Sequence, residues 1–339
     1  MKKIKYIWSL GIILLLNVSV FGQGPSMSPY DLKESYIEKR AAFKRINTKG
    51  VSTDEQAQLD RIVDILEKNA PNSFEYHFVK YSNGRYDLSL ADHLMEAKRL
   101  QPDNVDLIPE LFAYYLLIGD DKQASVYGKQ VLRGVSKNTQ NYYKAVLEDK
   151  TITTLLAGGV EDALPLLALQ ASGQIRSNVE IINFDFLLND DYLNKINAKY
   201  GLGSLQFLNN EKAYLLKLLP KAGGGLALST TINQAYFTLV ADKMFITGLT
   251  YRYGSENQII HLQNFWNRAK NELDGLTLNN RSERLLYRNY LPPLMTYYQL
   301  IPKGSAIRKE IKEVITKLTE QTGKKEEVLA IIKAYDQIE

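Results

Sequence analysis

Apolar positions recur at helical spacing from Ser26 to about Leu132. The clearest example begins at Ser52 to Glu55, a capping box in which a hydroxyl and a carboxylate three residues apart satisfy the first backbone N–H groups of a helix. A stripe at positions i, i+3, i+4 and i+7 follows, formed by Leu59, Ile62, Val63 and Leu66. Pro71 ends this segment, so the pattern predicts an amphipathic helix with one buried face.

Two helix pairs with related turn residues come next. The marked positions are Phe74, Tyr81, Gly84, Tyr86, Ala97 and Pro102 in the first pair, and Tyr114, Gly119, Ala124 and Val131 in the second. An early aromatic residue, a Gly at the turn and an Ala in the second helix resemble the tetratricopeptide repeat. Since one such pair cannot bury its apolar face alone, we expect residues 23–136 to form a helical domain with two stacked, degenerate repeats.

After about Lys137 the pattern changes to short β-type runs, which are Thr151 to Leu156, Val179 to Leu187, Leu226 to Thr231 and Leu249 to Tyr253. Helical stretches lie between them, at Glu161 to Gln170, Asp190 to Lys199 and Gln234 to Phe245. Strands that alternate with helices predict a small parallel sheet built from βαβ units. Residues 137–256 are therefore expected to form an α/β domain.

From Ile259 onward the pattern is helical again. Pro292 and Pro293 interrupt one helix, and Ser305 or the pair Lys303-Gly304 opens the next. That last helix has one apolar stripe, formed by Ile307, Ile311, Val314, Ile315 and Leu318. We expect residues 257–339 to pack on the α/β domain, which gives a predicted fold class of α/β with large helical content.

Residues 1–22 have the order of a secretory signal peptide. A Lys-rich start precedes an apolar run from Ile7 to Leu16, and the small residue Gly22 follows at the expected cleavage position. An uncleaved anchor helix is the alternative, but the mostly apolar run of about 15 residues is shorter than the ~20 residues of a membrane span. We therefore expect a periplasmic or secreted protein whose mature chain has no integral membrane segment.

Composition narrows the classes of partner and cofactor. Without the three lysines of the leader, the 42 basic residues fall to 39 against 38 acidic ones, so no surplus of positive charge favours nucleic acid. The absence of Cys excludes thiol nucleophiles, disulfides and Cys-ligated zinc. The three histidines, His77, His93 and His261, show no metal-ligand spacing, and we expect no metal and no cofactor.

The C-terminal half resembles the soluble region of bacterial polytopic membrane proteins likened to protein O-mannosyltransferases. The similar segments run from 154 to 192, from Leu228 to Asn233 and from Gly248 to Tyr253. Where that family shows G-D-N-D-T, this chain keeps Gly159 and Asp162 but lacks one acid and one hydroxyl. The resemblance implies a carbohydrate-related role, although the membrane-embedded part of the family has no counterpart here.

The segment around Gly158 also fits a second interpretation, a third tetratricopeptide unit. The placement of Thr151 to Leu156 decides between the two, because the repeat requires a helix there and the α/β domain requires a strand. The β-rich composition of these residues favours the strand.

Polar residues and glycines fall at the carboxyl ends of the predicted strands, where open α/β sheets bind ligands. They form the candidate ligand site Gly158, Gly159, Asp162, Asn183, Asp185, Thr230 and Asn233. Acids at a helix N-terminus repel anions, so a neutral sugar, a peptide amide or a cation is the expected ligand. The structural alternative is that these residues are only a tight turn and helix caps.

No pattern of catalytic residues emerges. Gly223 to Gly225 precede a strand instead of following one, and Ser229 lacks the G-x-S-x-G elbow. The 22 tyrosines include the adjacent pairs Tyr114-Tyr115, Tyr142-Tyr143 and Tyr297-Tyr298, each expected to have one buried and one half-exposed ring. The leading hypothesis is a non-enzymatic binding or scaffold protein for a protein partner in the cell envelope. A carbohydrate-related accessory protein or glycosyl-transfer enzyme, with a site near Asp162, is the alternative.

Overall fold

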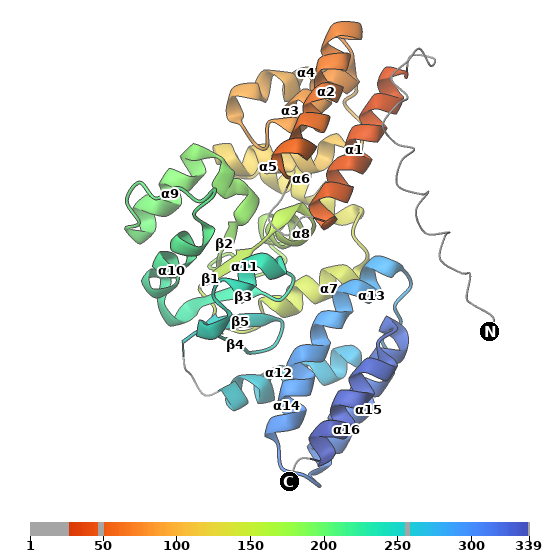
Figure 1. Ribbon diagram of the computed structural model, residues 1–339, viewed down its shortest axis with the longest axis vertical. Coiled ribbons are helices and arrows are strands. Elements are labelled where there is room, and N and C mark those ends of the chain that lie inside the picture. The colour runs from red at the N-terminus through yellow and green to blue at the C-terminus, as the bar shows by residue number, and fades with distance from the viewer. Residues whose placement is uncertain (1–26, 47–50, 255–257, 338–339) are drawn as a thin grey trace, which may run out of the picture.

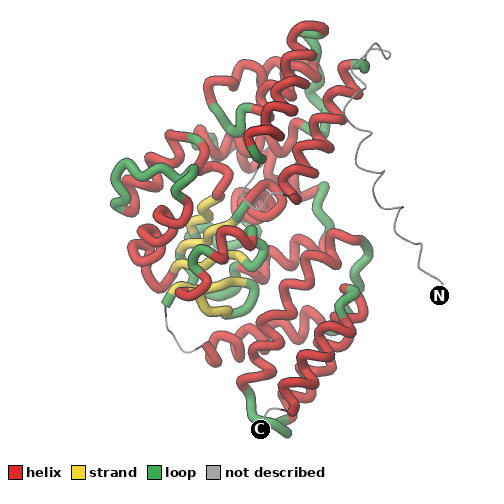
Figure 2. Tube along the Cα trace, in the orientation of Figure 1, coloured by secondary structure: helices red, strands yellow, loops and turns green. Residues whose placement is uncertain are grey.

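The computed structural model describes residues 27–46, 51–254 and 258–337, with the side chains of 44–46 and 159–161 left aside. Helices make up most of this part of the chain and surround one five-stranded sheet (Figures 1 and 2). This confirms the predicted α/β class with large helical content. The predicted signal peptide, residues 1–22, lies outside the described residues. Among the helices that are described, none is both long and apolar enough to cross a membrane.

The first two helices, α1 (Pro29–Ile46) and α2 (Thr53–Asn69), pack against each other at one end of the molecule. The capping box is present, since the Ser52 hydroxyl accepts a hydrogen bond from the Glu55 backbone and the Glu55 carboxylate accepts one from the Ser52 backbone. All four residues of the predicted stripe, Leu59 to Leu66, are buried. The helical spacing therefore identified the buried face correctly.

Two antiparallel helix pairs follow. The first comprises α3 (Phe74–Asn83), the short η1 (Leu88–Leu90) and α4 (Ala91–Leu100), and the second α5 (Leu107–Ile118) and α6 (Asp121–Arg133). Ala97 and Ala124, the alanines of the repeat-like pattern, are 0% and 2% exposed. The paired helices agree with the repeat-like expectation, while membership of the tetratricopeptide family stays a prediction.

The sheet has the strand order β2-β1-β3-β5-β4 and is mixed. Strand β1 (Thr154–Ala157) pairs in parallel with β2 (Glu180–Asn183) and β3 (Leu226–Ser229), as predicted. Strand β5 (Thr250–Tyr253) is antiparallel to β3 and to β4 (Met244–Ile246). The expectation of an all-parallel sheet is thus correct for three strands. It was wrong for the hairpin β4–β5, whose first strand lies in the segment predicted to continue a helix to Phe245.

Helices cover both faces of the sheet. On one face, alternate strand residues such as Leu156, Ile182 and Leu228 share a buried cluster with α9 (Asp190–Tyr200) and α10 (Glu211–Ala222). On the other face, Leu155 and Ile181 share a cluster with α7 (Lys137–Val146) and α8 (Gly159–Ala171). The remaining short elements are η2 (Phe184–Leu188), η3 (Gly223–Gly225), α11 (Gln234–Thr238) and η4 (Ala241–Lys243).

The C-terminal helices extend the second of these clusters. They are α12 (Gln258–Leu273), α13 (Arg281–Tyr287), η5 (Arg288–Tyr290), α14 (Leu291–Leu300), α15 (Ala306–Thr322) and α16 (Lys325–Gln337). Pro292 and Pro293 lie in the first turn of α14, and Ser305 caps α15 as expected. Most of the predicted stripe of α15 is buried, but Ile307 in its first turn is 39% exposed.

Helix α6 joins the helical pairs to the α/β layer through a close contact with α8. A Cβ atom on Gly128 would lie 3.2 Å from the Phe112 ring and 3.4 Å from the Ala168 Cα atom. The two backbones therefore approach closely only because position 128 has no side chain. The same helix carries Val126, which is 45% exposed and faces away from this contact.

We predict that Gly128→Leu destabilises the fold, because the added carbons must displace α8 or the Phe112 ring. Overpacking of this kind costs on the order of 1–3 kcal/mol. Denaturant unfolding of the purified chain measures the loss, and Val126→Leu on the exposed side of α6 provides the control. A Gly128→Leu chain as stable as the control would show that α6 and α8 can move apart without cost.

Candidate functional site

The predicted strand-end residues do lie at the carboxyl ends of β1, β2 and β3. Strand β1 ends at Ala157, Gly158 caps the following helix α8, and β1 pairs with β2. A strand at this position excludes the alternative of a third tetratricopeptide unit, which requires a helix there. Because the three strands are parallel, their following loops meet at one edge of the sheet.

Asp162 is the most buried acid of this edge, at 4% exposure. Its Oδ2 accepts a hydrogen bond from the Gly158 backbone N–H at 3.2 Å. Its Oδ1 accepts one from the Ser229 hydroxyl at 3.4 Å and another from the Thr231 hydroxyl. Burial raises the pKa of Asp162 to about 6, against the opposing effect of these hydrogen bonds. The carboxyl group thus ties the start of α8 to the loop after β3, and its oxygens are occupied by the protein itself.

The two asparagines of the candidate site act as caps. Asn183 Oδ1 accepts a hydrogen bond from the Asp185 backbone at 3.0 Å, and Asn233 Oδ1 accepts one from the Ala235 backbone at 2.9 Å. Asn183 is 0% exposed, and its Nδ2 has no hydrogen-bond partner within the described part of the chain. The geometry therefore favours the structural alternative for both residues, of which Asn183 is fully buried and Asn233 half-buried.

The helical pairs cover the end of β2. The loop residue Tyr86 packs edge-on against Phe186 of η2, with ring centroids 5.1 Å apart, and its carbonyl oxygen accepts a hydrogen bond from Asn189 Nδ2 at 3.0 Å. Asp185 lies in the electrostatic field of Arg40 from α1. The backbone at Tyr86 is left-handed, with φ of 68°, which a bulky residue adopts only where its surroundings hold it. The helical pairs and the α/β layer therefore contact each other at the end of β2.

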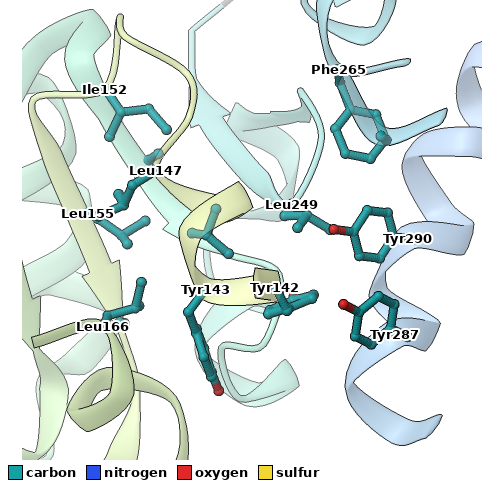
Figure 3. Packing of buried hydrophobic residues seen from close by; sticks show 14 of the residues in the cluster. Tyr142, Tyr143, Leu147, Ile152, Leu155, Leu166, Leu249, Phe265, Tyr287 and Tyr290 are labelled. Carbon is teal, nitrogen blue, oxygen red and sulfur yellow. The ribbon is translucent and has the colours of Figure 1, made fainter. Parts of the chain in front are cut away.

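Thr230 connects the strand ends to a buried group of tyrosines. Its hydroxyl lies 3.1 Å from the Tyr142 hydroxyl, and Tyr142 packs against Tyr287 and Tyr290 of the C-terminal helices (Figure 3). The Tyr287 hydroxyl in turn lies 3.2 Å from Glu272 Oε1. Burial raises the pKa of Glu272 above its ordinary value. Ring packing of Tyr142 on Tyr287 therefore links the hydrogen bond at Thr230 to the one at Glu272 of α12.

A pocket of about 340 Å³, widely open to solvent, lies beside Glu272 and Tyr287. It is formed by α7, α12, the following loop and Tyr287, and it is lined mainly by carboxyl, amide and hydroxyl groups. The lining includes Asn138, Asn141, Glu272, Asp274 and Thr277. Its volume is in the range of small-molecule sites. Sequence reasoning missed it, because its walls come from segments more than a hundred residues apart that have no motif in common.

The adjacent tyrosines do not follow the expectation of one buried and one half-exposed ring. Both rings of Tyr142-Tyr143 and of Tyr297-Tyr298 are buried, whereas both members of Tyr114-Tyr115 are half-buried. The expectation of one half-exposed ring per pair was wrong for all three pairs, because the packing of neighbouring elements, and not the position along one helix, sets the exposure of each ring. Tyr115 stacks with Tyr127 of α6, at 5.4 Å between ring centroids.

No protein-family model, curated protein or solved structure matches the chain. The similarity to the soluble region of proteins likened to O-mannosyltransferases therefore stays a prediction.

We predict that Asp162→Asn removes a pH dependence of folding stability. An unfolded Asp ionises near pH 4, but buried Asp162 holds its proton up to about pH 6. The folded state thus binds more protons between these values, so the wild-type free energy of unfolding falls as pH rises through this window and stays lower above it. The loss should be on the order of 2–3 kcal/mol.

The amide introduced by Asp162→Asn cannot ionise, yet it can accept from Gly158 and donate to the hydroxyls of Ser229 and Thr231. The variant should match the wild type near pH 4 and exceed it at pH 7.5, as measured by denaturant unfolding across pH. Asp103→Asn, at an exposed acid, controls for the change in net charge. A variant that is less stable than wild type at pH 7.5 would show that the fold needs the ionised carboxylate.

Proposed function

We propose that the chain is a non-enzymatic binding protein of the cell envelope that holds an acidic segment of a protein partner on its helical pairs. The predicted signal peptide supports the location. The observation that carries the binding role is a half-buried cluster of Lys98, Tyr115 and Tyr127, contributed by α4, α5 and α6.

Lys98 lies beside two stacked aromatic rings, those of Tyr115 and Tyr127. Its Nζ is 5.3 Å from the centroid of Tyr127 and 5.8 Å from that of Tyr115, and it donates a long hydrogen bond of 3.5 Å to the Tyr115 hydroxyl. Hydrogen bonding to Tyr127 raises the pKa of Lys98, so the ammonium stays charged. Within the described residues, no carboxylate forms an ion pair with it.

A half-buried ammonium without a counterion favours a ligand that supplies one. Aromatic rings stabilise the cation through their faces, but they leave its net charge uncompensated. A carboxylate from a partner would complete the pair, and tyrosine rings beside it offer contact area at low cost in conformational entropy. The cluster therefore suits an acidic side chain or a free carboxyl terminus on an extended peptide.

We predict that Lys98→Glu abolishes peptide binding, because it places a negative charge where the ligand's carboxylate would lie. An array of acidic peptides, paired with counterparts in which Asp and Glu become Asn and Gln, measures this directly. The wild type should bind the acidic members at least tenfold more strongly than their neutral counterparts. Lys129→Glu, on the exposed face of α6, makes the same change in net charge and should keep the preference.

Equal binding of acidic and neutral peptides would contradict the proposed chemistry. Loss of the preference in Lys129→Glu as well as in Lys98→Glu would instead assign it to the general charge of the surface.

A carbohydrate ligand is the second candidate, and the pocket between α7 and α12 favours it. Amides, carboxyls and a phenol are the groups that hydrogen-bond sugar hydroxyls. Calorimetric titration with a panel of mono- and disaccharides should detect binding to the wild type. Asn141→Ala should weaken this binding at least fivefold. Asn271→Ala, one residue before the pocket-lining Glu272, serves as the control. Absence of binding across the panel would remove this candidate.

A further inference from the structure

The paired helices α3 and α4 bring two histidines together. His77 of α3 and His93 of α4 are 16 residues apart in the chain, yet their Nδ1 atoms lie 2.9 Å apart. Their ring centroids are separated by 5.0 Å. Sequence spacing could not reveal this pair, because the contact depends on how the turn at Gly84 folds α4 back onto α3.

The two rings are held in place yet remain accessible. Tyr76 packs against both, at 5.2 Å from the His77 ring and 5.4 Å from the His93 ring, and both histidines are half-buried. Burial lowers the pKa of each imidazole below its ordinary value. Neutral imidazole is the form that ligates metals.

We propose that His77 and His93 bind one divalent transition-metal ion, with Cu²⁺ preferred over Ni²⁺ and Zn²⁺. Imidazole nitrogens bond such ions at about 2.0–2.1 Å, so two of them at right angles around one ion lie about 2.9 Å apart. A right angle is the geometry of neighbouring positions in square-planar Cu²⁺ and Ni²⁺ complexes, whereas tetrahedral zinc needs a separation of about 3.4 Å. Cu²⁺ also stands above Ni²⁺ and Zn²⁺ in general affinity.

The remaining coordination positions fall to water or to a nearby acid. No group of three or more potential metal ligands occurs among the described residues, so the protein itself presents two nitrogens. Glu96 lies one helical turn beyond His93 on α4, and it acts electrostatically on His77. Its carboxylate now pairs with Arg99, at 2.8 Å and 2.7 Å. Release from this exposed pair would let Glu96 supply an oxygen ligand.

The competing explanation is a direct hydrogen bond between the two rings. In that case one Nδ1 carries a proton and the other accepts it. Metal binding requires both rings to carry their proton on Nε2 instead, so both Nδ1 lone pairs face the ion. The two explanations differ in one measurable respect, which is whether added metal binds at this position.

The test titrates the mature chain, made without an affinity tag, with CuSO₄, NiCl₂ and ZnCl₂. Calorimetry should show one site with the order Cu²⁺, Ni²⁺, Zn²⁺, and electron paramagnetic resonance should show nitrogen coupling to Cu²⁺. His77→Gln and His93→Gln should each weaken Cu²⁺ binding at least tenfold. His261→Gln, at the remaining histidine, should leave it unchanged.

Thermal unfolding gives a second readout that does not depend on the stoichiometry of weak sites. Because a metal bound to both helices stabilises the folded state, Cu²⁺ should raise the Tm of wild type and not that of the His77→Gln/His93→Gln double variant. Binding in wild type that is no tighter than in the double variant would overturn the proposal and leave the hydrogen bond as the role of the pair.

Discussion

The burial of helix α8 is the constraint on which the rest of the structure depends. From Asp162 to Leu169, almost every residue of α8 is buried, whereas a surface helix buries one stripe. One side covers the sheet, another meets α6 at Gly128, and α7 packs nearby. The helical pairs, the α/β layer and, through α7, the C-terminal helices therefore share a core around one element. A change in α8 is expected to affect all three.

This arrangement explains why the carboxyl edge of the sheet is filled with the protein's own contacts. The N-terminus of α8 needs partners for its backbone N–H groups, and Asp162 supplies one while binding two hydroxyls from the end of β3 and the loop after it. The loop at Tyr86 covers the end of β2. In an open α/β sheet the same edge would hold a ligand, but here the Tyr86 loop and the hydrogen bonds of Asp162 occupy part of it. The surfaces proposed to bind a ligand therefore lie elsewhere, on α3 to α6 and beside α7.

Much of this fold could be predicted from local patterns, because helix caps and apolar stripes depend on residues close together in the chain. The capping box at Ser52, the strand before Gly158 and the helix after it all have the predicted form. Strand β4 could not be predicted in this way, since three residues are too few to show a period of their own. The missed signal was Gly248, whose φ of 142° allows the three-residue turn from Ile246 to Thr250. Pairing direction, too, depends on contacts between distant segments.

The same distinction applies to the sites. The strand-end residues could be placed correctly in the fold from sequence, but whether their side chains meet solvent or another layer depends on α1 and the Tyr86 loop, which come from a different part of the chain. Conversely, helix pairing alone brings together two other groups. One is Lys98 with Tyr115 and Tyr127, and the other is His77 with His93. Both groups involve α4, whose position is set by α3 on one side and α5 on the other. Packing inside the α/β layer thus accounts for stability. The half-buried lysine and histidine groups lie on the paired helices instead. A small shift of α4 would alter both groups together.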